Sequence, residues 1–356
     1  MTIRSWLVTI VLVSVLMTQA GPVQARDLAL EARLTEAFTS GELPGLHSAL
    51  IIHRGETLAE LYFPGADESW GQALGVREHG PDSLHDLRSV TKSITSLLYG
   101  IALSEGLVPS VDEPVVSQFP EYADLASDPA RQAILIRHVL SMRMGTAWDE
   151  SLPYTDPRNS EIAMELAQDR YRYVLEQPII STPGEQWNYS GGATALIGRL
   201  IAKGAGMPLD AYARERLFGP LGISHFEWKR GGDGEPSAAS GLRMTAPDLA
   251  RIGLLIQNGG RHAGRQIVPE DWLKQSFRAR ASLRSGLRYG FFWWLHPKGD
   301  PPLGVAGFGN GGQRLSIGLE SGLTVVVFAG NYNDPQAWKI PVRVLTDFAL
   351  PAVGNE

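Results

Sequence analysis

A serine and a lysine three positions apart, Ser89 and Lys92, are residues whose types and spacing suit catalysis. In a helix this spacing places both side chains on one face, one turn apart. Residues 89–105 are mostly apolar, which predicts a buried helix here. Free N–H groups in its first turn stabilise an oxyanion, and burial favours an uncharged amine. Lys92 is therefore a candidate base for Ser89, although an N-cap serine followed by a solvated lysine has the same spacing.

A tyrosine at a predicted loop-to-helix junction is the second candidate. Tyr189 follows the turn-rich stretch 183–188 and precedes a predicted helix over 192–204. A phenol in such a place can pass a proton between a nucleophile and a leaving group. The same residue would also fit a purely structural role, packing the loop together with Trp187. Tyr189 is therefore a catalytic candidate only together with Ser89.

Glycines cluster in the stretch 307–312, just before a predicted strand over 313–319. Without side chains they let a substrate approach the backbone closely and leave N–H groups exposed. The segment formally matches the G-x-G-x-x-G pattern of dinucleotide sites, but that pattern requires a helix after the glycines, and a strand follows here. We therefore expect a strand that helps to hold an oxyanion, not a nucleotide site.

The overall composition argues against several other chemistries. The chain has 356 residues, a formal charge of −6 and no cysteine, so thiolate metal sites, disulfides and a basic nucleic-acid footprint are not expected. Its eight histidines are scattered without an H-E-x-x-H pattern, and His138 lies in an apolar segment where a structural role is expected. The chain also lacks the G-x-S-x-G pattern. We expect neither a metal nor another cofactor.

Both helices and strands are needed to position these residues. The predicted order is a helix, a hairpin, a long mainly helical stretch, then strands and a closing helix. A turn-rich loop over 231–240 separates the helical stretch from the rest of the chain. This order predicts one sheet assembled from both parts of the chain around a helical insertion, with a site in the cleft between them. The predicted helices cover 28–39, 89–105, 130–141, 161–175, 192–204, 209–217 and 245–257, one more begins near 335, and the predicted strands cover 48–52, 57–63, 289–295, 304–309, 313–319 and 323–329.

The first residues follow the secretory pattern. Arg4 supplies a positive charge, an apolar run follows over 6–17, and small residues precede a predicted cleavage after Ala25. Residues 1–25 are therefore expected to be a signal peptide, and a second acceptable cleavage site ends at Ala20. An exported chain without cysteine fits a bacterial periplasm or the medium. We expect periplasmic or secreted localisation, without stable membrane association after cleavage.

Taken together, the three motifs resemble those of the serine β-lactamase-like hydrolase superfamily, which includes penicillin-binding DD-peptidases, class C β-lactamases, esterases and 6-aminohexanoate-oligomer hydrolases. Supporting stretches lie at 87–93, 136–142 and 217–223. The resemblance implies an α+β, β-lactamase-like fold with an antiparallel sheet flanked by helices. The implied domains are an α/β sheet domain over 26–88 plus 241–356 and a mainly helical domain over 89–240, which carries the nucleophile helix and the Tyr189 loop.

The resemblance also implies a role for each motif. Ser89 would be acylated by the substrate, Lys92 would take its proton, and Tyr189 would relay protons. The backbone N–H groups of Ser89 and Gln313 would form the oxyanion hole. Further residues would lie against the substrate: Asn310, Gly311, Gly312, Trp148 and Tyr154.

Two departures from the family pattern bear on the substrate. Gly191 stands where the Y-x-N motif has an asparagine. Asn310 and Gly311 stand where the K-T-G motif has the lysine and threonine that help β-lactam-binding members to hold a carboxylate. Arg314 is expected to point to the wrong face of its strand to replace that charge. A serine hydrolase acting through an acyl-enzyme on a small ester or amide is therefore expected.

The altered second and third motifs leave other interpretations open. A β-lactamase, a DD-peptidase or a non-catalytic binding protein on the same fold would also fit. The sequence determines neither the particular ester, amide or β-lactam nor the oligomeric state. In each case the expected partner is a small molecule and not a nucleic acid.

Overall fold

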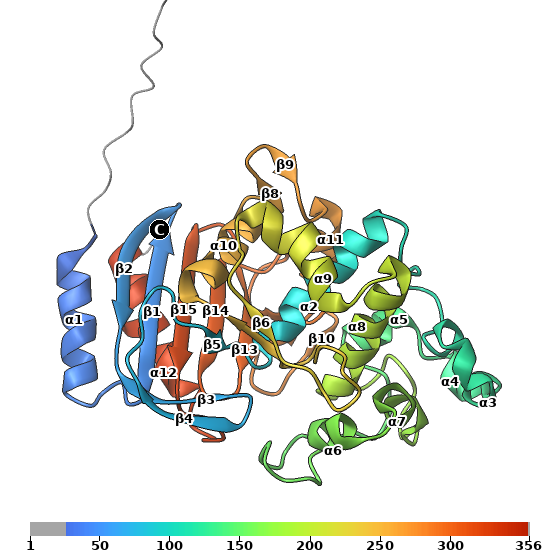
Figure 1. The fold of residues 1–356 in the computed structure, drawn as a ribbon. Helices are drawn as coiled ribbons and strands as arrows, with labels where there is room; N and C mark the ends of the chain where they lie inside the picture. The colour runs from blue at the N-terminus through green and yellow to red at the C-terminus, as the bar shows by residue number, and fades with distance from the viewer. Residues whose placement is uncertain (1–25, 355–356) are drawn as a thin grey trace, which may run out of the picture.

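The computed structural model describes residues 26–354, so the predicted signal peptide over 1–25 lies outside the described residues. One large antiparallel sheet consists of β1 (Leu46–His53), β2 (Glu56–Tyr62), β10 (Ala281–Ser282), β11 (Arg288–Tyr289), β12 (Trp294–Leu295), β13 (Gly304–Gly309), β14 (Gln313–Gly318) and β15 (Leu323–Ala329). Its order is β10-β11-β12-β13-β14-β15-β1-β2 (Figure 1). The predicted α+β fold, with a sheet built from early and late parts of the chain, is confirmed.

Strand β1 joins the early and late parts of the chain. It pairs with its hairpin partner β2 on one side and with β15 on the other, where Leu50 lies opposite Val326. Ala49 and Ile51 face an apolar cluster formed with α1 (Leu28–Thr39) and the helices after β15, while Leu50 faces the main core. Because both faces are covered, the strand is a continuous apolar run and not an alternating one.

Helix α2 (Val90–Ser104) lies at the centre of the molecule (Figure 1). Residues 90–102 are all buried. The helix packs against α8 (Gly191–Ala205), α11 (Glu270–Ser276) and β13. The helix that begins with the candidate serine is therefore surrounded by protein along most of its length.

Two of the predicted helices are interrupted by side chains that cap new ones. The carboxylate of Asp169 accepts the backbone N–H groups of Tyr171 and Arg172, which starts a new helix inside the predicted one. The ring of His138 accepts the N–H of Leu135, a structural role of the kind expected of this histidine. The predicted helices over 130–141 and 161–175 are replaced by α4 (Pro129–Gln132), α5 (Ile136–Leu140), α6 (Ser160–Leu166) and α7 (Arg170–Glu176).

The aromatic strand predicted over 289–295 is also interrupted. Phe292 has a φ of 60°, in the left-handed region. Its N–H binds the carbonyl of Leu140 and not a neighbouring strand. Only the two short strands β11 and β12 therefore remain of this prediction.

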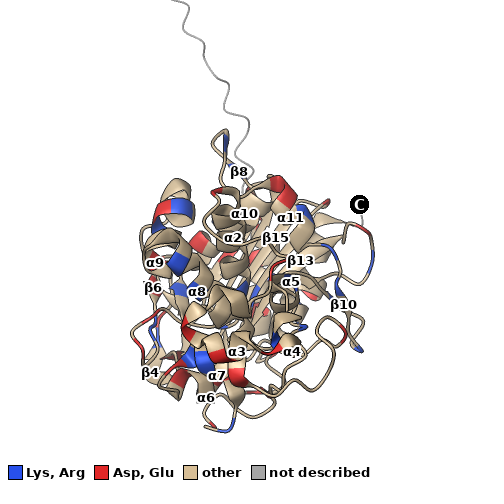
Figure 2. Cartoon of the chain, turned by 90° about the vertical axis from the view of Figure 1, so that its right-hand side faces the viewer, with Lys and Arg blue, Asp and Glu red and all other residues tan. Residues whose placement is uncertain are grey.

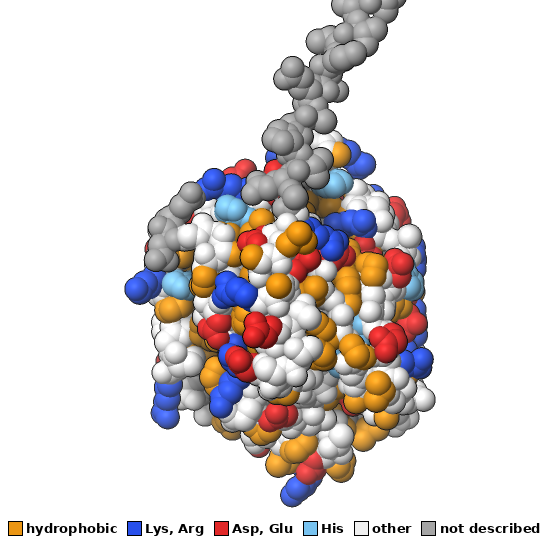
Figure 3. Space-filling view, turned by 90° about the vertical axis from the view of Figure 1, so that its left-hand side faces the viewer, with side chains coloured by type: hydrophobic (Ala, Val, Ile, Leu, Met, Phe, Trp, Pro, Cys, Tyr) orange, Lys and Arg blue, Asp and Glu red, His pale blue; other side chains and the backbone are white. Residues whose placement is uncertain are grey.

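Smaller elements complete the described chain. Basic and acidic residues are interspersed along the ribbon in Figure 2, and side chains of both charges are interspersed on the opposite face in Figure 3. No helix in residues 26–354 is both long enough and apolar enough to cross a membrane. The remaining elements are α3 (Ala123–Ala126), α9 (Leu209–Ala213), α10 (Ala246–Gln257), α12 (Lys339–Arg343), α13 (Leu350–Val353), β3 (Gly65–Ser69), β4 (Gln72–Arg77), β5 (His85–Asp86), β6 (Glu227–Trp228), β7 (Leu242–Met244), β8 (Arg261–His262) and β9 (Arg265–Gln266).

Strand β13 lies directly against the start of α2. A Cβ atom built at Gly309 would lie 2.4 Å from the carbonyl oxygen of Leu87, and one at Gly307 would lie 3.0 Å from Cγ1 of Val90. The first of these distances is too short for any side chain. The glycines of this strand therefore have a packing role, because they bring the sheet against the backbone that leads into the candidate nucleophile.

Replacing Gly309 by alanine should displace Leu87 and lower the free energy of unfolding by about 1–3 kcal/mol, the usual cost of overpacking. Urea unfolding of the variant measures this. Gly232→Ala is a matched control, since the nearest atom to its added Cβ would be 3.7 Å away. Equal stability of G309A and G232A would show that strand and helix are not packed this closely.

Candidate active site

The backbone just before the candidate nucleophile is strained. Arg88 has a φ of 47°, a region that residues other than glycine rarely adopt. Its guanidinium pairs with the carboxylates of Glu68 and Asp86, and Nε lies 3.0 Å from the latter. Asp86 also accepts the N–H of Trp70 at 2.6 Å. These contacts fix the turn that presents Ser89, and strain of this kind is common where function requires it.

The side chains of Ser89 and Lys92 lie in contact at the start of α2. Nζ of Lys92 is 2.9 Å from Oγ of Ser89. Lys92 is 1 % exposed, and its Nζ also lies 3.1 Å from the carbonyl oxygen of Ala239 and 3.3 Å from Oε2 of Glu161. Lys92 is therefore not the solvated lysine that the same spacing also allowed. An amine placed here can exchange a proton with the serine while bulk water is kept away.

Tyr189 lies against the same pair. Its hydroxyl hydrogen-bonds with Ser89, and Nζ of Lys92 lies 5.0 Å from the centre of its ring. The ring is tilted against Trp294 of β12, with 6.1 Å between the two ring centres. Burial, and then the negative charge of Glu150, raises the pKa of Tyr189 well above its usual range. The phenol is therefore protonated at neutral pH and suited to donate a proton.

The sequence reasoning did not select Glu161, the acid beside Lys92. Glu161 lies in the first turn of α6 and is 2 % exposed. A Cβ atom built at Gly191 would lie 2.2 Å from Oε2 of Glu161. The carboxylate thus fills the space that a side chain at position 191 would need. One feature of the sequence pointed to Glu161. Gly191 stands where the Y-x-N motif has an asparagine, and the missing side chain leaves room for another group.

Glu150 is a second buried acid that the sequence reasoning did not select, although it named two of its neighbours. Oε1 of Glu150 accepts the N–H of Gly191 at 2.6 Å and Nε1–H of Trp148 at 2.6 Å. Oε2 accepts the hydroxyl of Tyr154 at 2.8 Å. Burial raises the pKa of Glu150 to about 7, and the charge of Glu161 adds to this effect. Near neutral pH the carboxyl group of Glu150 is therefore partly protonated.

A cavity of about 200 Å³ opens onto Ser89. Tyr154 and Asn310 also line it, so two of the predicted substrate contacts lie beside the serine. Trp148 does not belong to this lining, and its Nε1–H donates to Glu150 instead. The volume suits a small substrate and is too small for a folded polymer chain.

The turn between β13 and β14 holds the remaining candidates. Gly311 and Gly312 have φ angles of 89° and 99°, which glycine adopts without strain. The side chain of Gln313 donates to the carbonyl of Ala329 at 2.6 Å and accepts its N–H at 3.1 Å. The two glycines therefore shape the turn, the glutamine side chain anchors it to β15, and Asn310 is left to face the cavity.

The positive charges near the cavity already have partners. Within the described lining the cation is Arg88, which pairs with two carboxylates. Arg314 lies outside the lining, where its Nε donates to Oγ of Ser316 at 2.8 Å and its guanidinium lies 4.2 Å from the ring centre of Phe308. Burial lowers the pKa of Arg314 to about 10, so the group stays charged at neutral pH. A substrate carboxylate would find no free cation in this lining.

The chain is similar to several known hydrolases. A family model described as Beta-lactamase matches residues 30–339. The 6-aminohexanoate-dimer hydrolase of Paenarthrobacter ureafaciens is 24 % identical over 343 residues, which cover 89 % of this chain and 80 % of that protein. The lovastatin esterase of Penicillium rubens is 28 % identical over 224 residues, which cover 54 % of this chain and 53 % of that protein.

Solved structures share the fold. The β-lactamase/D-alanine carboxypeptidase of Pseudomonas syringae has a TM-score of 0.66 and is 18 % identical, with 89 % of this chain and 98 % of that chain covered. The β-lactamase-like fold that the motifs implied is therefore confirmed.

Replacing Glu150 by glutamine should change how stability depends on pH. The pKa of Glu150 is raised in the fold to about 7, so its contribution to stability is complete below the pKa of the unfolded chain, about 4.3, and is lost as the pH rises toward 7. The glutamine variant does not titrate. Between pH 5 and pH 8 the free energy of unfolding of the wild type should therefore fall by up to about 3 kcal/mol relative to that of the glutamine variant.

Urea unfolding at the two pH values measures this difference. Glu36→Gln is the matched control, because Glu36 is exposed on α1. The control should follow the wild type at both pH values. If E150Q and the wild type lost stability equally between pH 5 and pH 8, the raised pKa of Glu150 would be wrong.

Proposed function

Because the chain belongs to the beta-lactamase family, a family of serine hydrolases that work through an acyl-enzyme, we propose that it hydrolyses a small carboxylic ester or amide with Ser89 as its nucleophile. One observation carries the proposal: Oγ of Ser89 lies 2.9 Å from the buried Nζ of Lys92 and lines a cavity. Two relatives are named as an esterase and as a 6-aminohexanoate-dimer hydrolase, which supports this substrate class.

In the acylation step, Oγ of Ser89 attacks the carbonyl carbon of the substrate, and its proton passes to the amine of Lys92. The carboxylate of Glu161, 3.3 Å away, stabilises the ammonium that forms. The N–H groups of Ser89 and Gln313 hold the oxyanion. The bond to the leaving group then breaks, the leaving group takes the proton of Tyr189, and the ammonium of Lys92 returns a proton to the phenolate.

Deacylation repeats these transfers with water in place of the alcohol or amine. A water molecule attacks the ester carbon, and its proton passes to Lys92. Oγ of Ser89 then leaves, takes the proton of Tyr189, and Lys92 restores the phenol. The products are a carboxylic acid and the enzyme in its starting protonation state.

The charges of the cavity favour a substrate without a carboxylate next to the scissile bond. β-Lactams and D-Ala-D-Ala peptides carry such a carboxylate. Here Asn310 and Gly311 replace the lysine and threonine of the K-T-G motif, and Arg88 is occupied by two acids. Neutral esters and small amides avoid the cost of burying an unpaired charge.

We also propose that the protein acts in the periplasm or the medium. The secretory pattern of residues 1–25 supports this, as does the absence of cysteine, which fits a bacterial exported protein. Its proposed partner there is the small-molecule substrate.

Ser89→Ala should lower the turnover of p-nitrophenyl acetate by about 10³-fold or more, since the nucleophile is lost. Tyr189→Phe should lower it by about 10²- to 10⁴-fold, the usual contribution of a proton donor. Initial rates for the ester measure both. A fluorophosphonate probe should label the wild type and leave S89A unlabelled.

Ser282→Ala is the matched control, because Ser282 is exposed on β10, and its rate should equal that of the wild type. Turnover by S89A at the control's rate would eliminate Ser89 as the nucleophile. The same assay on nitrocefin, a D-Ala-D-Ala peptide and aminohexanoate oligomers tests the substrate class. Faster turnover of nitrocefin than of the ester would replace the proposed substrate by a β-lactam.

Gly191→Asn tests whether Glu161 occupies the asparagine's place. The added side chain would overlap the Glu161 carboxylate, so G191N should lose stability and esterase activity. In the double variant G191N/E161A the space is free, and part of the stability should return. We expect an interaction free energy of at least about 1 kcal/mol in the double-mutant cycle. Additive effects in urea unfolding would show that the two side chains do not compete for one space.

A further inference from the structure

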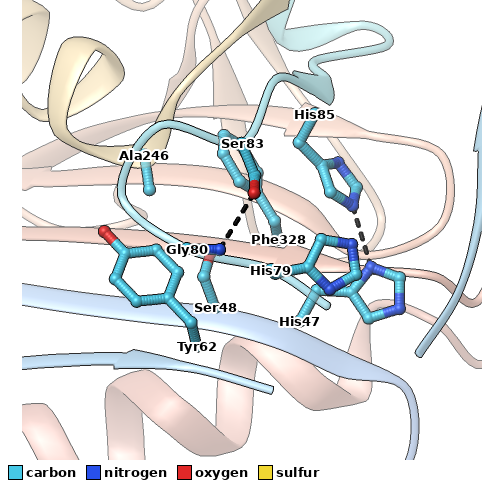
Figure 4. Close-up of a pocket in the computed structure, with 9 residues that line it drawn as sticks. All are labelled: His47, Ser48, Tyr62, His79, Gly80, Ser83, His85, Ala246 and Phe328. Carbon is cyan, nitrogen blue, oxygen red and sulfur yellow. Dashed lines mark hydrogen bonds between the residues drawn. The ribbon is translucent and has the colours of Figure 1, made fainter. Parts of the chain in front are cut away.

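Three histidines and an aspartate from four separate segments converge outside the active-site cavity. They are His47 on β1, Asp67 on β3, His79 in the loop after β4 and His85 on β5. One ligand atom from each residue lies within 4.8 Å of all the others. Figure 4 shows the three imidazole rings close together, with the ring of His79 stacked on that of His47 at 4.2 Å between the ring centres. None of the four residues lines the cavity at Ser89.

The distances between these atoms fit a tetrahedron around one ion. Nδ1 of His47 lies 2.9 Å from Nε2 of His85. Nε2 of His85 lies 3.4 Å from Oδ1 of Asp67, and Nε2 of His79 lies 3.8 Å from Oδ2 of Asp67. Zinc binds imidazole nitrogen at about 2.0–2.1 Å in a tetrahedral site, which places neighbouring ligand atoms about 3.3 Å apart. The observed separations lie on both sides of this value.

Backbone carbonyls set the tautomers of two of the rings. Nδ1 of His79 lies 2.8 Å from the carbonyl oxygen of Phe63, and Nδ1 of His85 lies 3.2 Å from that of Asp86. A carbonyl only accepts hydrogen bonds, so each Nδ1 carries the proton and each Nε2 presents a lone pair to the cluster. Imidazoles that ligate metals are commonly oriented in this way.

The cluster is buried, and one of its lone pairs lacks a donor. The side chains of His79, His85 and Asp67 are 5 %, 2 % and 3 % exposed. Nε2 of His79 has no hydrogen-bond partner among the described residues. Oδ1 of Asp67 accepts the hydroxyl of Tyr332 at 3.1 Å, which leaves Oδ2, 3.8 Å from Nε2 of His79, for the cluster. A buried acceptor without a donor costs about 1–3 kcal/mol, a cost that a cation at this point would remove.

The surrounding backbone makes room for the cluster. A Cβ atom built at Gly65 would lie 2.3 Å from Nε2 of His47, and one at Gly330 would lie 2.5 Å from Cε1 of the same ring. The ring of His47 therefore fits only because both positions are glycines. Phe328 of β15 stacks on His85 with 4.7 Å between the ring centres, which holds a second ring in place.

We propose that His47, Asp67, His79 and His85 bind one structural zinc ion. Three imidazoles and one carboxylate are a donor set that zinc prefers, whereas calcium and magnesium select oxygen ligands. All four ligands come from the protein, as in structural and not catalytic zinc sites. The ion ties the β3–β4 hairpin and the loop after it to β1 and β5. The expectation of no metal rested on local spacing, and these ligands share no local motif.

Metal binding by the full chain tests the proposal. Protein stripped with a chelator and dialysed should bind one equivalent of Zn²⁺ per chain by elemental analysis, and Co²⁺ in its place should show the intense visible absorption of a tetrahedral site. Zn²⁺ should raise the thermal midpoint of the stripped wild type. Asp67→Asn, which keeps the size of the side chain, and His79→Ala should each bind less than about a tenth of an equivalent.

His262→Ala is the matched control, since His262 is exposed on β8, and it should still bind one equivalent. A folded, stripped wild type that takes up neither Zn²⁺ nor Co²⁺ would overturn the proposal and leave a proton shared between His47 and His85. Unchanged binding by D67N and H79A would overturn it as well, because the ion would then lie elsewhere. Esterase activity is not the readout, so the result is independent of the proposed function.

Discussion

The burial of one amine governs the candidate site. An amine without water needs partners inside the protein, and Lys92 finds them in Ser89, in a backbone carbonyl and in Glu161. Burial raises the pKa of the nearby Glu150, and the negative charge of Glu161 adds to this effect. Tyr189, beside these acids, keeps its proton too. Burial of the groups around Lys92 thus determines which of them hold a proton.

The sequence correctly predicted the elements that are determined by residues close together in the chain. The hairpin β1–β2, the buried helix α2 and the strands β13 to β15 agree with their predictions to within a few residues, because apolar periodicity and turn residues define them. The interruptions at Asp169 and Phe292 were missed. At Asp169 a local side-chain cap outweighs the periodic pattern. At Phe292 a left-handed residue does so, and its N–H binds the carbonyl of the distant Leu140.

The same distinction separates the parts of the site. Ser89 and Lys92 were recognisable because one helical turn joins them. Glu161 reaches the lysine from a segment that only the fold brings near, and Glu150 binds Gly191 in the same way. The histidine cluster is the extreme case, since each of its members comes from a different segment. The signs of such groups in the sequence were glycines. At Gly191 the side chain of Glu161 fills the space that a side chain would need, and at Gly65 and Gly330 the ring of His47 does so.

The pairing of β1 with β15 has a consequence for biosynthesis. A ribosome emits β1 and its hairpin long before Leu323–Ala329, so the nascent chain carries an unpaired strand edge throughout its translation. Strand β13, which packs on the approach to Ser89, also emerges late. The candidate site therefore stays unassembled while the chain is being made. This topology delays completion of the fold until the last strands have been synthesised.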